Sequence, residues 1–82
     1  MNETDLKLKG ETEKWLLRIE PILYKVKPIN SEGSELLKNM LAYVSDSKHF
    51  LDKKDFIRAF EAIVWAWAIY ELGKELGIFK TS

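Results

Sequence analysis

The chain has 82 residues, enough for one domain and too few for two. Basic and acidic residues balance at 13 each, so no overall positive field draws the chain toward nucleic acid or an anionic membrane. Cysteine is absent, which excludes disulfides, thiolate catalysis and cysteine-ligated metal sites.

The first predicted helix covers residues 4–26. Its apolar residues recur at helical spacing, so they share one face that we expect to be buried. This face consists of Leu8, Thr12, Trp15, Leu16, Ile19, Ile22, Leu23 and Val26. Pro21 falls on the opposite, solvent side, and we expect a kink or an interruption there because proline removes one backbone hydrogen bond.

A run rich in Pro, Asn, Ser and Gly, "KPINSEGSE" at 27–35, predicts the one substantial loop of the chain. The second predicted helix covers residues 31–52 and begins at Asn30 or Ser31, both of which are good N-caps. Its inward face consists of Leu36, Leu37, Met40, Val44, Ser47 and Leu51, and Tyr43 and Phe50 lie on one flank.

The third predicted helix covers residues 55–76, follows the turn "KKD" at 53–55, and uses Asp55 as its cap. One face is an ordinary core stripe of Phe56, Ala59, Phe60, Ile63, Ala66, Trp67 and Tyr70. Roughly opposite lies a second apolar face of Ala62, Trp65, Ile69, Leu72 and Leu76, and the polar strip is limited to Glu61, Glu71 and Glu75. The end, "ELGIF" at 75–79, predicts a helix stop in which Gly77 is left-handed and Ile78 or Phe79 folds back.

Short connections favour antiparallel neighbours, so we predict an all-α fold, a three-helix up-down-up antiparallel bundle that spans residues 1–82 as a single domain. The longest apolar run, Ala62 to Tyr70, is far shorter than the roughly 20 residues of a membrane-spanning helix. The N-terminus is also too polar for a signal peptide, and we therefore expect a soluble, cytoplasmic protein.

The second half of the chain also carries a series of short motifs at consistent spacing. These are Asp46-Ser47, the turn Lys53-Lys54-Asp55, Ala59-Phe60-Glu61-Ala62, Trp65-Ala66 and Leu76-Gly77-Ile78-Phe79. With these motifs, residues 43–79 resemble the archaeal domain-of-unknown-function family DUF357. The chain departs from the family pattern at Lys54, where glycine is expected, at Trp65, where tyrosine is usual, and at Glu71, where aspartate is expected. The resemblance implies a small three-helix bundle of archaeal, cytosolic origin, and it implies no activity.

Asp46 and Glu61 are a candidate ligand or acid–base site, because antiparallel neighbours could bring the two carboxylates together. The simpler interpretation is that Asp46 pairs with Arg58 or accepts a hydrogen bond from a Tyr or Trp, while Glu61 is solvated. Asp46, His49 and Asp52 have side chains that suit a metal ion, but their spacing places the two aspartates about 120° apart around the helix. We therefore predict no metal site and no cofactor.

A group of cations surrounds the predicted turn, namely Lys48, Lys53, Lys54 and Arg58. They could hold a nucleic-acid backbone weakly, which leaves a nucleic-acid-associated protein as an alternative. Asp52 and Asp55 are interleaved and dilute the patch, so ordinary solubilising charge is favoured.

The three tryptophans, Trp15, Trp65 and Trp67, raise the question of a stacking pocket for a planar ligand. Trp15 and Trp67 lie on predicted core faces, and only Trp65 belongs to the second apolar face. In a three-helix bundle each helix faces two others, which leaves part of that face on the surface. We therefore predict a non-catalytic module that associates with itself, as a dimer, or with another protein through Trp65, Ile69, Leu72 and Leu76. The alternative is that the first helix and the folded-back C-terminus cover this face completely.

Overall fold

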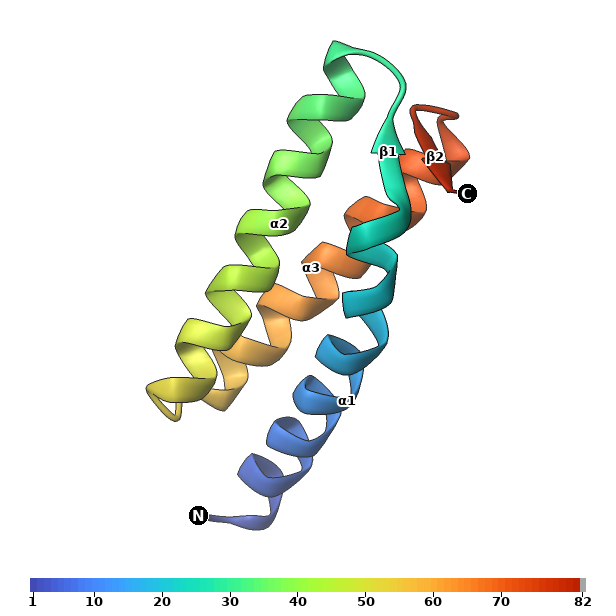
Figure 1. Cartoon of the computed structure of the whole chain (residues 1–82). Coiled ribbons are helices and arrows are strands. Elements are labelled where there is room, and N and C mark those ends of the chain that lie inside the picture. Colours follow the sequence, from blue (N-terminus) through green and yellow to red (C-terminus); the bar gives the residue numbers. More distant parts are fainter. Residues whose placement is uncertain (82) are drawn as a thin grey trace.

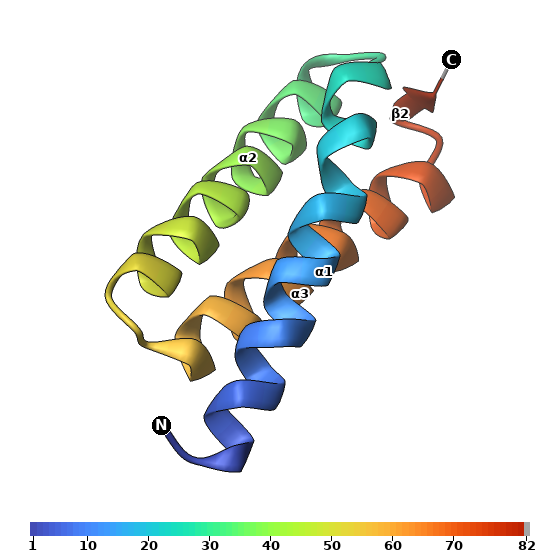
Figure 2. The same cartoon turned by 60° about the horizontal axis from the view of Figure 1, so that its bottom comes forward.

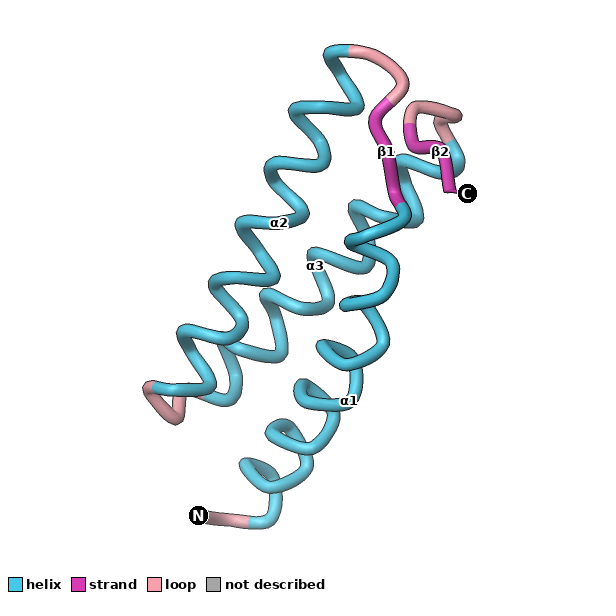
Figure 3. Tube along the Cα trace, viewed as in Figure 1, coloured by secondary structure: helices cyan, strands magenta, loops and turns pink. Residues whose placement is uncertain are grey.

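The computed structural model describes residues 1–81 and contains three helices, α1 (Glu3–Lys25), α2 (Ser31–Asp52) and α3 (Phe56–Glu75). They run up, down and up in an elongated bundle that measures 43 × 18 × 18 Å (Figure 1). The predicted three-helix bundle is confirmed, and the predicted helix bounds agree within one residue at each end. Two strands of three residues, β1 (Val26–Pro28) and β2 (Phe79–Thr81), were not predicted (Figure 3).

The central element is α3, which packs against α2 on one side and α1 on the other (Figure 1). In the view of Figure 2, α1 crosses in front of α3, and α1 and α2 contact each other little. The core forms where the three apolar faces meet, and Ile19, Met40 and Ile63 are fully buried there, one from each helix. Ser47 is buried between α2 and α3, where its hydroxyl donates a hydrogen bond of 2.7 Å to the Ala59 carbonyl. This bond satisfies the one buried polar group at the contact.

Each helix begins at a side-chain cap. Asn2, Asn30 and Asp55 accept hydrogen bonds from the backbone N–H three residues later, at 2.7, 2.9 and 3.2 Å. Pro21 does not interrupt α1, which continues to Lys25. Pro21 lies on the exposed side, as predicted, where water can solvate the carbonyl that loses its partner. A bend at this position stays a prediction, since it is compatible with a continuous helix.

The end of α3 folds back as predicted. Gly77 is left-handed with φ 71°, the N–H of Ile78 donates to the Gly73 carbonyl at 3.0 Å, and the N–H of Gly77 donates to Lys74 at 3.1 Å. This is the Schellman arrangement. It turns the chain so that Phe79 becomes buried against Gly73, where even a Cβ atom would overlap the ring.

The folded-back segment pairs with the chain between α1 and α2. Val26 is opposite Thr81, and Pro28 is opposite Phe79, in antiparallel register. The loop predicted at 27–35 is therefore much shorter in the structure. Its first residues belong to β1, which ends at Pro28, and its last residues belong to α2, which begins at Ser31. Three-residue strands are too short for an alternating pattern to reveal, which is why the sequence did not predict them.

The turn between α2 and α3 repeats the Schellman arrangement without a glycine. The N–H of Asp55 donates to Phe50 at 2.9 Å and the N–H of Lys54 donates to Leu51 at 3.0 Å. Lys54 occupies the left-handed position with φ 60°. The turn geometry that glycine would favour is thus kept with lysine, at the cost of some backbone strain.

Candidate functional site

The apolar face opposite the core of α3 is split between solvent and the bundle. Trp65, Leu72 and Leu76 are exposed at 57%, 45% and 60%, whereas Ile69 is only 8% exposed and belongs to the core. Ile69 lies about 40° further around the helix than Trp65, on the side against which α2 packs. The prediction that Ile69 is part of the exposed surface is therefore corrected, and we call Trp65, Leu72 and Leu76 the Trp65 surface.

Two further exposed apolar residues of α3, Ile57 and Val64, were missed. They are 60% and 47% exposed and belonged to neither of the two predicted faces. The available signal for Val64 was the unbroken apolar run from Ala62 to Tyr70, and Ile57 lies outside this run. Among residues 1–81, no helix combines the length and apolar character needed to cross a bilayer.

Trp65 is held at the seam between α2 and α3. Its indole stacks on the ring of Tyr43, with centroids 6.1 Å apart and planes inclined by 19°. A hollow of about 510 Å³ opens beside this pair, and its walls are Leu36, Asn39, Ala42, Tyr43, Asp46, Trp65 and Ile69. The Trp65 surface therefore combines projecting apolar side chains with an adjacent hollow.

Asp46 and Glu61 do come together, as the sequence suggested. Both line a smaller hollow of about 270 Å³ on the other side of Trp65. Arg58 lies in the same hollow but pairs with Asp55, 3.6 Å away, so the proposed Asp46–Arg58 pair is replaced by a different one. Both carboxylates are exposed to solvent.

The cations around the turn are partly neutralised. Lys48 reaches Glu20 of α1 at 3.7 Å, and Arg58 is paired with Asp55, so two of the four cations already have carboxylate partners. His49 is exposed, and its ring contacts Phe50 edge-on at 5.6 Å. Within residues 1–81, no three acidic or histidine side chains are arranged to hold a metal ion.

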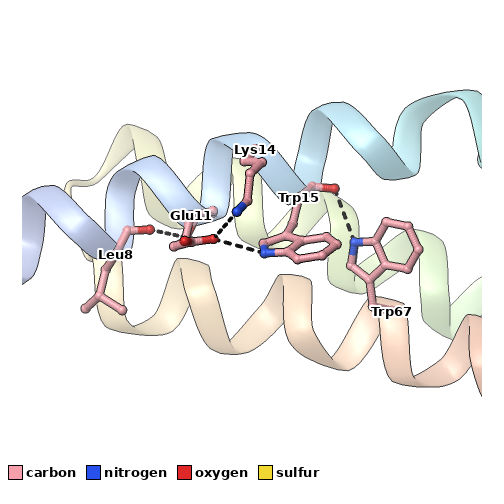
Figure 4. Close-up of polar contacts among 6 residues, drawn as sticks. Leu8, Glu11, Lys14, Trp15 and Trp67 are labelled. Atoms are coloured by element: carbon pink, nitrogen blue, oxygen red, sulfur yellow. Dashed lines mark hydrogen bonds and ion pairs between the residues drawn. The ribbon is translucent and has the colours of Figure 1, made fainter.

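Trp15 and Trp67 join α1 to α3. Their rings meet edge-on with centroids 5.5 Å apart, and the Trp67 Nε1–H donates to the Trp15 carbonyl at 3.2 Å (Figure 4). Trp15 in turn donates its Nε1–H to Glu11 at 3.1 Å, and Lys14 lies 2.9 Å from the same carboxylate. The hydrogen bond from Lys14 is the main reason that the pKa of Glu11 lies below its ordinary value of 4.5.

Both indoles were predicted to be core, but each is only half-buried. With Ile63 and Val64 they line a third hollow of about 310 Å³, which we call the Trp15–Trp67 recess. All four lining residues come from α1 and α3.

The comparisons with known proteins agree on one family. The model of the family DUF357, described as a protein of unknown function, matches residues 11–79. The crystal structure of protein AF1782 from Archaeoglobus fulgidus, described under the same family, is 40% identical, covers 98% of this chain and 100% of that chain, and has a TM-score of 0.89. Among curated proteins no match is found.

Proposed function

Because this chain belongs to the DUF357 family, a family of unknown function, we propose a function on the basis of its exposed apolar surface. The protein is a small, non-catalytic assembly module that binds a second copy of itself. The contact is made by the Trp65 surface. The relative from Archaeoglobus fulgidus is consistent with the archaeal origin that the family resemblance implied.

The observation that carries this proposal is the exposure of Trp65. Tryptophan is among the residues that contribute most to protein–protein binding when they reach a desolvated centre. Here the indole is fixed by Tyr43, so little side-chain entropy remains to be lost when a partner covers it. Leu72 and Leu76 continue the apolar surface toward the end of the helix.

The size and shape of the surface favour a second copy. A stable interface buries roughly 800 Å² on each partner, more than one face of a helix about 30 Å long provides. The α2 side of the seam, with Tyr43 and Leu36, supplies the remaining area. A two-fold contact requires one patch to match itself. The Trp65 surface meets this requirement because it offers both projecting apolar groups and a hollow.

The alternative functions rest on weaker features. The hollow with Asp46 and Glu61 is a candidate ligand site, and a thermal scan across divalent metals and nucleotides would reveal a bound ligand as a raised midpoint. Binding to nucleic acid would be recognised by its salt dependence. The pairing of Lys48 and Arg58 with carboxylates makes this the less favoured alternative.

The test of the proposal is the solution mass of the full chain, measured by light scattering on a sizing column from low micromolar to near-millimolar concentration. A mass that reaches twice the monomer value of 9.6 kDa supports self-association. A monomer mass at every concentration contradicts it.

A further inference from the structure

The Trp15–Trp67 recess lies on the α1 side of α3, apart from the α2–α3 seam that carries the Trp65 surface. Its four lining residues are Trp15, Ile63, Val64 and Trp67, all apolar. A volume of about 310 Å³ is at the lower end of the range of small-molecule sites, which are also mainly apolar and aromatic. The recess therefore has the size and lining for a small ring system.

The walls of the recess are fixed before anything binds. The hydrogen bond from Trp67 to the Trp15 carbonyl holds one indole, and the bond from Trp15 to Glu11 holds the other. Tyr70 packs edge-on against Trp67, with centroids 5.9 Å apart. Preformed aromatic walls reduce the ordering cost of binding, and they offer edges and faces for contact with a planar ligand.

The charges next to the recess favour an anion. The guanidinium of Arg18 lies 4.9 Å from the centre of the Trp15 ring, and Lys14 lies 5.3 Å from it. Lys14 is paired with Glu11, whereas Arg18 has no carboxylate within ion-pair distance among residues 1–81. Two cations and one carboxylate leave a net positive charge beside Trp15.

From these observations we propose that the Trp15–Trp67 recess binds a small planar aromatic molecule that carries one anionic group. The ring occupies the hollow against the two indoles and Val64, and the anionic group lies toward Arg18. This site is separate from the Trp65 surface and does not depend on self-association.

Two fluorescent probes of similar shape test the proposal on the full chain, the anionic 8-anilinonaphthalene-1-sulfonate and the neutral N-phenyl-1-naphthylamine. Val64→Trp fills the recess from its exposed side, and Trp65→Ala is the matched control on the other surface. We expect saturable binding of both probes to the native chain, a loss of about tenfold or more in affinity with Val64→Trp, and no change with Trp65→Ala. Val64→Glu provides a second blocking variant in case Val64→Trp fails to fold, because its side chain enters the recess and its carboxylate repels the sulfonate.

Arg18→Gln tests the anionic group separately. We expect it to lower the affinity of the sulfonate probe about two- to fivefold, the range of an exposed ion pair, and to leave the affinity of the neutral probe unchanged.

Near-UV circular dichroism must show native packing in every variant, because this sulfonate also binds partly unfolded states. Absence of probe binding to the native chain, or binding that survives both blocking variants, overturns the site. Equal binding of the sulfonate to Arg18→Gln overturns the anionic preference. The solution mass is measured independently, so failure here is distinct from failure of the proposed self-association.

Discussion

Trp65 stacks on Tyr43 with nearly parallel rings 6.1 Å apart, yet more than half of its surface remains open to solvent. The contact joins α3 to α2 and fixes the direction in which the indole projects. An aromatic side chain that is held firmly and left uncovered is suited to receive a partner.

Replacing Trp65 by alanine tests that role. We expect Trp65→Ala to weaken association by about 2 kcal/mol or more, because the change removes the proposed anchor of the interface. The monomer should remain folded, since most of the side chain lies outside the core. Sedimentation equilibrium measures the first effect and far-UV circular dichroism the second. Tyr24→Ala, which truncates a still more exposed aromatic on α1, is the control and should leave association unchanged. Unfolding of Trp65→Ala would instead assign Trp65 to the core.

A methyl group at Gly73 should release the C-terminal segment. The added Cβ would overlap the Phe79 ring, so we expect Gly73→Ala to destabilise the fold by about 1–3 kcal/mol through overpacking. Gly10 has no atom within 4 Å of the same position, and Gly10→Ala should stabilise α1 by about 0.5–1 kcal/mol. Urea unfolding of both variants measures the difference. Equal stabilities of the two variants would show that Phe79 does not pack on Gly73.

The left-handed conformation of Lys54 predicts a gain from glycine. Lys54→Gly should raise the free energy of unfolding by about 1 kcal/mol, because glycine avoids the clash of the Cβ atom with its own backbone at positive φ. The neighbouring Lys53 has φ −84°, so Lys53→Gly removes the same charge without relieving strain and should be neutral or destabilising. Thermal unfolding at several concentrations separates this effect from association. A loss of stability in Lys54→Gly would contradict the left-handed assignment.

Removing the Ser47 hydroxyl takes from the Ala59 carbonyl the second hydrogen bond that it accepts in addition to its bond within α3. We expect Ser47→Ala to cost about 1–2 kcal/mol of unfolding free energy, since the 2.7 Å bond is shielded from water. Ser45→Ala, two residues away and exposed, should change stability by less than about 0.5 kcal/mol. Chemical unfolding of the pair gives the comparison, and similar values for the two variants would indicate that water replaces the lost donor.

The carboxyl group of Glu11 should titrate below its ordinary pKa of 4.5, chiefly because Lys14 donates a hydrogen bond to it. A lowered pKa in the folded state means that the interaction contributes fully above the unfolded-state value and is lost as the pH falls through the folded-state pKa. Lys14→Gln removes the main cause, so the pKa of Glu11 measured by NMR should rise toward 4.5. Lys25→Gln, in the last turn of α1 and far from Glu11, should leave it unchanged. An unaltered titration of Glu11 in Lys14→Gln would refute the pairing.

Much of the fold could be predicted because its signals are local. Asn30 and Asp55 mark helix starts because each side chain accepts a hydrogen bond from the backbone N–H three residues later. Gly77 marks a helix end because it adopts the left-handed conformation. The apolar repeat of α1 identifies Ile19 as core without reference to any other helix. The candidate site was predicted only in part, because Trp65 and Ile69 belong to the same predicted apolar face of α3. Their different exposure, 57% and 8%, depends on how α2 packs against that face.

Local sequence signals were enough to predict the three helices, their approximate bounds, the caps of α2 and α3, and most of the apolar faces that are buried, since these follow from backbone hydrogen bonding and a fixed angle per residue. Which apolar residues remain exposed depends instead on how the helices pack. The side of α3 against which α2 packs buries Ile69 and leaves Trp65 exposed. The contact of α1 with α3 joins Trp67 to Trp15, 52 residues apart, and the pairing of β1 with β2 closes the end of the bundle. These contacts depend on the relative position of distant segments, which no local pattern specifies.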